Sequence, residues 1–204
     1  MKKPPVVTNV RAYLYNPKLH KVVRIDDLKN LKPVAETHNL DMYAGYDVVG
    51  RAMAGYSNYY VNTFYFEFTN VGAGGVVPNP RPVFSGDDDI TYYTGLAANY
   101  DYLRVPISIA PDLQASTADY TSNQVEFFAT SSGNTSGENG EDFGSGALVL
   151  STVYGLALVC APDPSDKLQD IIVARAYFDL GDEVLLLPNQ NIGITHSIKF
   201  EAAY

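Results

Sequence analysis

The chain has 204 residues, of which 46% are hydrophobic, and a formal net charge of −9 at pH 7. This length suits one domain with an extension, and the composition is sufficient for a buried core, which excludes a chain that is disordered throughout. The single cysteine, Cys160, excludes an intrachain disulfide and is predicted to be a buried, inert thiol.

The charge is divided unevenly along the chain. Residues 1–35 carry eight Lys/Arg and two Asp, for a net charge of +6, whereas residues 36–204 carry six Lys/Arg and twenty-one Asp/Glu, for −15. The acidity of the longer part argues against nucleic acid as its partner. The basic part is suited to docking on an acidic surface, such as the body of an identical neighbour.

Residues 1–38 are predicted to form an extended basic arm, in which residues 6–15 and 21–25 are candidate strands. Its apolar side chains need burial against the body, a neighbouring copy or another protein. The predicted interface residues of the arm are Val6, Val7, Val10, Tyr13, Leu14, Val22, Val23 and Ile25. Its predicted basic contacts are Lys2, Lys3, Arg11, Lys18, Lys21 and Arg24. Deletion of residues 1–35 is expected to leave a folded body that no longer assembles.

A short helix is predicted near residues 40–54. Asn39 or Asp41 can cap its start, and Gly55 suits the left-handed position after its end. The spacing i, i+4, i+7 and i+11 predicts one helical face, which consists of Met42, Tyr46, Val49 and Met53.

The pattern after residue 55 is typical of strands. Phe64, Phe66 and Phe68 alternate with polar or aromatic residues, which indicates one buried face. Residues 148–160 form an apolar run suited to a central strand, and residues 131–146 are predicted to be an exposed loop. The candidate strands are residues 59–69, 103–109, 124–130, 148–160, 171–178, 183–187 and 192–200. Within residues 171–178, Ile172, Ala174, Ala176 and Phe178 are expected to share a face.

Several short strands and one helix predict an all-β body over residues 39–204. We expect a mostly antiparallel β-sandwich, with a barrel as the alternative, preceded by the extended arm of residues 1–38. No apolar run approaches the roughly 18 residues of a membrane-spanning helix, and no signal peptide is predicted, so a soluble protein without a membrane partner is expected.

No catalytic, cofactor or metal site is predicted. His20, His38 and His196 lack the partners of a zinc site, and His196 is predicted to be a half-buried structural residue. The three carboxylates of Asp87, Asp88 and Asp89 could bind calcium, although a solvated acidic turn is the expected interpretation. A glycoside hydrolase with paired carboxylates is an alternative that the sequence does not exclude, because cross-strand distances cannot be read from a sequence.

Tyrosine is abundant, with sixteen residues and no tryptophan. Tyr43, Tyr46, Tyr56, Tyr59, Tyr60 and Tyr65 form an early group, and Tyr92, Tyr93, Tyr100 and Tyr102 form a second one. Tyrosine suits protein interfaces and sugar-binding surfaces because its ring is rigid and its tip is polar. The alternative is that these rings cap the edges of the sheets.

The order of segments resembles that of a type of tailed-bacteriophage virion protein. The closing strands carry the resemblance, since such proteins end with "leu-ala-arg-ala-x-phe" and "ile-thr-trp-x-ile-x-phe" strands. The matching segments, within about residues 40–200, are Tyr46-Asp-Val-Val-Gly-Arg-Ala-Met-Ala-Gly55, residues 61–68, Tyr102-Leu-Arg-Val-Pro106, Val125-Glu-Phe-Phe-Ala129, Ile171-Ile-Val-Ala-Arg-Ala-Tyr-Phe178 and Ile192-Gly-Ile-Thr-His-Ser-Ile-Lys-Phe200. The chain departs from the pattern at His196, where an aromatic residue is common, and in its arm.

The resemblance implies a non-enzymatic structural protein without a cofactor, located in the virion after assembly in the host cytoplasm. It would contact copies of itself and other virion proteins at the tail, neck or fibre attachment, or decorate the capsid. The alternative is a carbohydrate- or receptor-binding β-sandwich module that uses tyrosines and loop carboxylates such as Asp87–Asp89. A hydrolase on a β-scaffold is a third interpretation.

Overall fold

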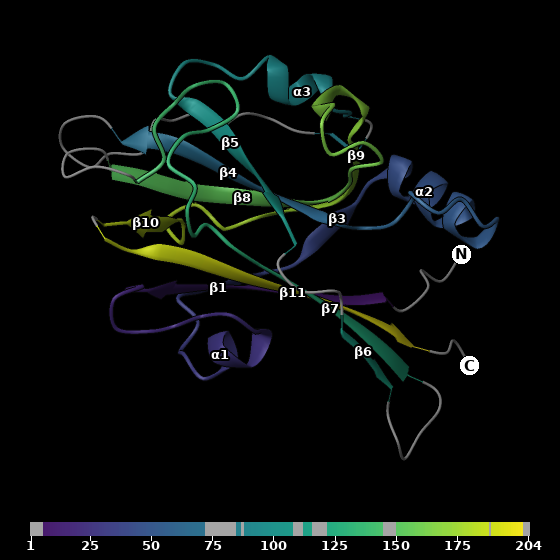
Figure 1. Ribbon diagram of the computed structural model, residues 1–204, viewed down its shortest axis with the longest axis horizontal. Helices are drawn as coiled ribbons and strands as arrows, with labels where there is room; N and C mark the ends of the chain where they lie inside the picture. The colour runs from purple at the N-terminus through teal and green to yellow at the C-terminus, as the bar shows by residue number, and fades with distance from the viewer. Residues whose placement is uncertain are drawn as a thin grey trace.

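The computed structural model describes residues 6–71, 85–86, 88–107, 112–115, 122–144, 150–187 and 189–201. Within these residues the chain is mostly β, as the sequence predicts, and its strands form two antiparallel sheets (Figure 1). Short helical segments lie on the outer side of each sheet, so that α1 and α3 are at opposite ends of the view in Figure 1.

Sheet A consists of five described strands. In spatial order they are β2 (Ala35–Thr37), β1 (Val6–Tyr15), β11 (Asn191–Glu201), β7 (Ser122–Thr130) and β6 (Asp112–Ala115). The first and last long strands of the chain are therefore neighbours, and they pair from Val6 opposite Phe200 to Tyr15 opposite Asn191. This long-range pairing joins the two ends of the described chain in one sheet.

Residues 6–15 of the predicted arm pack on the body itself, which is one of the three places that the sequence left open for the apolar side chains of the arm. Strand β1 lies between β2 and β11, so it is an inner strand of the body rather than an extension from it. Val10 and Ala12 enter the main core, whereas Tyr13 and Tyr15 are buried on the opposite face of sheet A. A strand with apolar residues on both faces needs cover on both sides, which the body itself supplies.

Helix α1 (Ile25–Lys29) provides the cover on the outer face of sheet A. Its Ile25 and Leu28 pack on the buried tyrosines of β1, and Gly193 makes room, because a Cβ there would lie 2.6 Å from Leu28 Cδ2. The Asp27 carboxylate accepts the N–H of Val23, at 2.9 Å, and stabilises the start of the helix. The strand predicted for residues 21–25 is therefore wrong.

Sheet B consists of six described strands. Five follow the spatial order β3 (Asn39–Asp41), β9 (Ile171–Tyr177), β8 (Leu150–Cys160), β4 (Thr63–Val71) and β5 (Tyr100–Pro106), and β10 (Val184–Leu186) also pairs with β8. Strand β8 is central and its residues are almost all buried, which confirms the prediction from its apolar run. The predicted loop after β7 is also confirmed for residues 131–144, where the described residues form only an isolated bridge.

A bulge changes the facing of one predicted residue. The register between β8 and β9 shifts at Leu158 and Val159, so that Val159 pairs with Ile172 while Leu158 pairs with Ala174. Ile172 then packs in an outer cluster, whereas Ala174 belongs to the main core. The expectation that these two residues share a face is wrong, because an extra residue in one strand inverts the facing beyond it.

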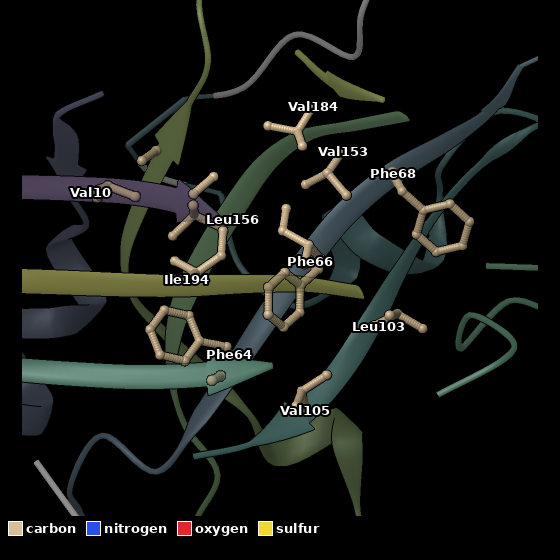
Figure 2. Close-up of a cluster of buried hydrophobic side chains, with 14 of the residues drawn as sticks. Val10, Phe64, Phe66, Phe68, Leu103, Val105, Val153, Leu156, Val184 and Ile194 are labelled. Carbon is tan, nitrogen blue, oxygen red and sulfur yellow. The ribbon is translucent and has the colours of Figure 1, made fainter. Parts of the chain in front are cut away.

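The main core lies between the two sheets, in a sandwich-like arrangement (Figure 2). Phe64, Phe66 and Phe68 of β4 point into it, as their alternation predicts, and Val10 and Ile194 reach it from sheet A. Burial of each such side chain contributes about 1.5–3 kcal/mol to folding. Because both sheets supply side chains to one cluster, neither sheet is expected to fold without the other.

Helix α2 (Tyr43–Met53) confirms the predicted helix, and Gly55 has the expected left-handed backbone, with φ of +88°. The predicted caps are wrong, because Met42 occupies the cap position and Asn39 and Asp41 belong to β3. The outer face of sheet B is covered by α3 (Thr91–Thr94) and by a segment with a short 3-10 helix (Lys167–Gln169).

Candidate functional site

The structure distributes the predicted interface residues over three environments. Val10, Tyr13 and Ile25 are buried within the chain itself, Leu14 and Val22 are half-buried, and Val23 is exposed; the side chains of Val6 and Val7 lie outside the described residues. Most of the predicted apolar interface is thus internal packing. Its burial removes the reason to expect a partner at β1.

The predicted basic residues remain on the surface. Arg11, Lys18, Lys21 and Arg24 are exposed, whereas Lys2 and Lys3 lie outside the described residues. Arg11 pairs with Glu36, with Nε and Oε1 3.1 Å apart. We use the term basic surface for Lys18, Lys21, Arg24 and Lys32, which lie on the segment that carries α1 along the outer side of sheet A.

The acidic turn before α3 has a local structural role. Asp88 accepts the N–H of Ser85 at 2.6 Å, and Asp89 accepts the N–H of Thr91 at 2.8 Å, while Asp87 lies outside the described residues. The hydrogen bonds from Thr91 hold the pKa of the Asp89 carboxyl below its usual value. The described residues contain no group of three or more His, Cys, Asp or Glu arranged to hold a metal ion.

The three histidines differ in exposure and in their contacts. His20 is exposed, and His38 lies at the sheet edge with its Nδ1 2.7 Å from the carbonyl oxygen of Thr8. His196 is fully buried, not half-buried as predicted, and neither ring nitrogen has a hydrogen-bond partner among the described residues. Burial lowers the pKa of His196 to about 3, so the ring is neutral at pH 7.

An ion pair lies buried on the outer face of sheet B. Arg175 of β9 donates from Nε to Glu67 Oε1 of β4 at 2.5 Å, and both side chains are fully buried. Tyr93 of α3 donates its hydroxyl to the same carboxylate at 2.8 Å. Burial and the nearby Glu67 charge raise the pKa of the Tyr93 hydroxyl.

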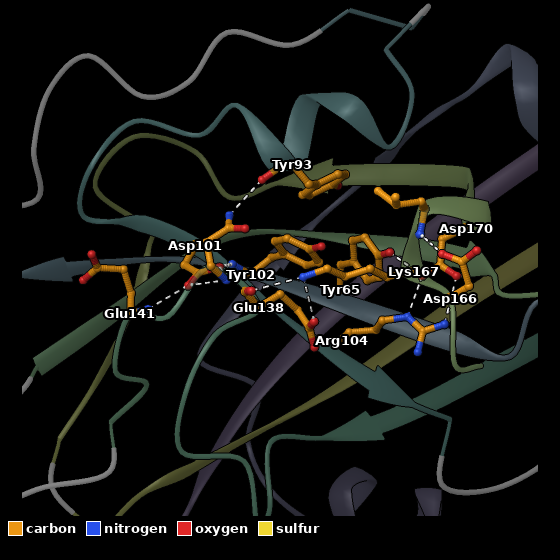
Figure 3. A network of polar contacts seen from close by, with 12 residues as sticks. Tyr65, Tyr93, Asp101, Tyr102, Arg104, Glu138, Glu141, Asp166, Lys167 and Asp170 are labelled. Atoms are coloured by element: carbon orange, nitrogen blue, oxygen red, sulfur yellow. Dashed lines mark hydrogen bonds and ion pairs between the residues drawn. The ribbon is translucent and has the colours of Figure 1, made fainter. Parts of the chain in front are cut away.

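A second polar group fixes the segment before β9 (Figure 3). Arg104 of β5 binds Asp170 through two nitrogens, with Nε 2.6 Å from Oδ2 and the second donor 2.9 Å from Oδ1. The Tyr65 hydroxyl also donates to Asp170. Burial and the Asp170 charge raise the pKa of the Tyr65 hydroxyl, so this tyrosine is a hydrogen-bond donor rather than a base.

Asp101 anchors the loop that follows β7 (Figure 3). Its buried carboxylate accepts the backbone N–H of Asn139 at 2.9 Å and that of Glu141 at 2.9 Å. Gly137 is required beside it, because a Cβ there would lie 2.3 Å from Asp101 Oδ2. The loop predicted to be exposed is therefore tied to the edge of sheet B by this side chain.

These buried polar groups were missed by reasoning from the sequence. A signal did exist, because Glu67 stands between two phenylalanines of β4 and Arg175 stands between two alanines of β9. Charges at such positions are rarely fully buried without a partner. Because both side chains are enclosed, the ion pair has a structural role: it joins β4 to β9 across β8, and Tyr93 of α3 binds the same carboxylate.

One face of α2 exposes several large apolar side chains. Tyr43, Tyr46, Val49 and Met53 are between 53% and 85% exposed, and Gly50 lies among them. We call these five residues the α2 stripe. The helix buries Gly45 and Val48 instead. The predicted face of Tyr46, Val49 and Met53 is therefore real, but it points to solvent, apart from Met42, which is buried.

Tyrosines extend the stripe beyond the helix. Tyr56 is 59% exposed and makes an edge-to-face contact with Tyr59, whose ring lies under the Arg51 guanidinium. Tyr60 is also exposed. Large apolar side chains gathered on an exposed helix are typical of a site of contact with another molecule. It is the candidate functional site of this chain.

Comparison of the chain with protein-family models, with curated proteins and with solved structures finds no match. Among the described residues, no helix has the length and apolar character that would let it cross a membrane. The site is therefore interpreted from its own geometry.

Proposed function

We propose that this chain is a non-enzymatic structural subunit that works in multiple copies in a tailed-phage virion. The observation that carries the proposal is the α2 stripe, whose large apolar side chains face solvent on a helix held firmly against β9. Exposed aromatic and methionine side chains are typical of the central part of protein interfaces. The closing strands that resemble virion proteins supply the particle as the context.

The basic surface adds a second element to this proposal. Lys18, Lys21, Arg24 and Lys32 are exposed on the outer side of sheet A, while the chain as a whole is acidic. Opposite charges on two subunits speed their encounter and select the orientation in which they meet. Assembly through surfaces of the folded body replaces assembly through a free arm, because β1 is an inner strand.

The mass of the purified full-length protein tests this proposal. Light scattering over a range of concentrations, at low and high salt, is expected to show a defined oligomer. Immunogold labelling of phage particles with antibodies against this chain is expected to mark a fixed position on each particle. A monomer at every concentration, together with unlabelled particles, would contradict the proposed function.

A carbohydrate-binding module is the second candidate, and the exposed rings of Tyr43, Tyr46, Tyr56 and Tyr60 favour it. A sugar would stack on such rings while their hydroxyls bind its polar groups. Screening of the monomeric protein against a glycan array separates the two candidates. Binding that is lost in a Tyr46→Ala variant, without any oligomer, would favour the module.

A further inference from the structure

Helix α2 contains two glycines in opposite surroundings. A Cβ at Gly45 would lie 2.5 Å from the carbonyl oxygen of Val173, so this glycine lets the helix approach β9 closely. At Gly50, no heavy atom other than those of its chain neighbours and of the adjoining helix backbone lies within 4 Å of the Cβ position, and the residue is exposed. A glycine inside a helix costs about 1 kcal/mol relative to alanine. A Cβ at position 50 would therefore meet no neighbouring side chain or strand in the described chain.

Gly50 lies in the middle of the α2 stripe. At 3.6 residues per turn, Tyr46, Gly50 and Met53 fall on one side of the helix, and Val49 lies beside them. The missing side chain at Gly50 leaves a notch between Tyr46 and Met53, whose side chains are exposed. A glycine between larger apolar residues suits the close approach of another backbone.

We propose that the α2 stripe is a self-pairing surface, on which α2 of a second copy packs in antiparallel orientation with Gly50 at the crossing point. This inference rests on the proposed function and names the contact through which copies meet. A two-fold axis brings the same stripe of both copies together, so one set of residues has to be complementary to itself.

The charges beside the stripe have that self-complementarity. Asp47 and Arg51 lie along one flank of the helix and are about half exposed, with Arg51 Nε 2.7 Å from Asp47 Oδ2 in the single copy. An antiparallel pair related by a two-fold axis places the same flanks side by side. Asp47 of each copy then lies beside Arg51 of the other, which is an attractive arrangement. This charge pattern favours a second copy over an unrelated partner.

Substitution of Gly50 in the full-length protein tests the crossing point. Gly50→Ala is expected to raise the melting temperature, because helix propensity improves without a clash, yet to weaken self-association several-fold. Gly50→Leu is expected to weaken it at least tenfold while the circular dichroism spectrum stays unchanged. Ser132→Leu, at an exposed position outside α2, is the control and is expected to leave the dissociation constant unchanged. Sedimentation velocity measures all three.

Charge reversal tests the orientation. Asp47→Arg alone places like charges opposite each other in a homodimer, and so does Arg51→Asp alone. Both variants are expected to dissociate at least tenfold more readily than the wild-type chain. A one-to-one mixture of the two is expected to form a heterodimer with restored affinity, because every flank contact becomes attractive again.

The outcomes separate this inference from the proposed function. If the wild-type chain forms oligomers that the Gly50 and charge variants leave unchanged, self-pairing through α2 is wrong and the proposed function stands. If the mixture of charge variants fails to restore binding, the antiparallel arrangement is wrong. If the wild-type chain is a monomer at every concentration, self-pairing through α2 is wrong, and the labelling of phage particles then decides the proposed function separately.

Discussion

Arg175 and Glu67 form an ion pair across a third strand, and both side chains are fully buried. Arg175 belongs to β9 and Glu67 to β4, and the pair crosses β8 diagonally, because Glu67 lies opposite Gly155 and Arg175 lies opposite Ala157. A Cβ at Gly155 would lie 2.7 Å from the ring of Tyr177. The guanidinium lies 4.8 Å from the centre of that ring and 4.2 Å from the centre of the Tyr92 ring. Gly155 therefore leaves room for the Tyr177 ring, on which the Arg175 guanidinium packs.

Removal of one member of this pair is expected to destabilise the fold strongly. Glu67→Ala leaves a buried guanidinium without its carboxylate, and the free energy of unfolding is expected to fall by about 3–5 kcal/mol. The double variant Glu67→Leu/Arg175→Met should lose less than Glu67→Ala, because neither position then carries a charge. Urea unfolding at pH 7 measures all of these values. A neutral Glu67→Ala variant would show that the pair does not contribute to stability.

The buried His196 is expected to make the protein sensitive to acid. Its pKa is about 3 in the folded chain and close to the ordinary value of 6.5 after unfolding, so the unfolded chain binds the additional proton between these values. Stability is therefore expected to be unaffected above pH 6.5 and to decrease as the pH falls toward 3. At pH 4.5 the loss amounts to about 2–3 kcal/mol.

The replacement His196→Leu isolates this effect. The variant removes the titrating ring but keeps an apolar side chain between Val10 and Phe127, its partners on the neighbouring strands. Urea unfolding at pH 7.5 and pH 4.5 is expected to show a smaller loss of stability on acidification for the variant than for the wild-type chain. Equal losses would mean that carboxylates alone cause the acid sensitivity.

Strand β1 is expected to be essential for folding. Val10 is fully buried in the main core, whereas Val23, from the same predicted arm, is 53% exposed. Val10→Asp places an unpaired charge in the core and is expected to abolish cooperative unfolding or lower stability by several kcal/mol. Val23→Asp is the matched control and is expected to change stability by less than about 0.5 kcal/mol.

Truncation provides an independent test of β1. Deletion of residues 1–35 removes an inner strand together with α1, so the remaining chain is expected to lose cooperative thermal unfolding. A deleted chain that still unfolds cooperatively, with a near-ultraviolet circular dichroism spectrum like that of the wild type, would restore the idea of a separate arm.

Asp101 is expected to control the order of the loop after β7. Asp101→Leu removes the acceptor of the Asn139 and Glu141 amides, which are then left without this partner. Stability is expected to fall by about 2–3 kcal/mol, and the loop should become more sensitive to proteolysis. Limited proteolysis with mapping of the cleavage sites checks this. Cleavage patterns identical to those of the wild type would show that other contacts hold the loop.

The local elements of this chain follow from short-range patterns. Alternation predicts the inward Phe64, Phe66 and Phe68, and the apolar run predicts the central strand β8. Helical spacing predicts α2, and its end at Gly55 follows from the backbone freedom of glycine. These features depend on neighbours a few residues away, so a single sequence is sufficient to predict them.

The candidate site depends on contacts between distant parts of the chain. Periodicity places Tyr46, Val49 and Met53 on one face of a helix, but it cannot tell whether that face meets β9 or solvent. In the structure Gly45 faces the backbone of Val173 and Gly50 faces solvent, so the presence of glycine does not identify the buried side of the helix either.

The amino-acid sequence by itself determined helix α2 and long strands such as β4, β8 and β11, but not α1, which begins where a strand was predicted. Only the tertiary structure decided that the basic N-terminal segment belongs to the body, since β1 obtains its partners from β11 at the other end of the chain. It also decided that Glu67 meets Arg175, 108 positions apart. The physical reason is that the hydrophobic effect favours burial of apolar surface without specifying a partner. Which segment covers a given apolar surface depends on the packing of the whole chain.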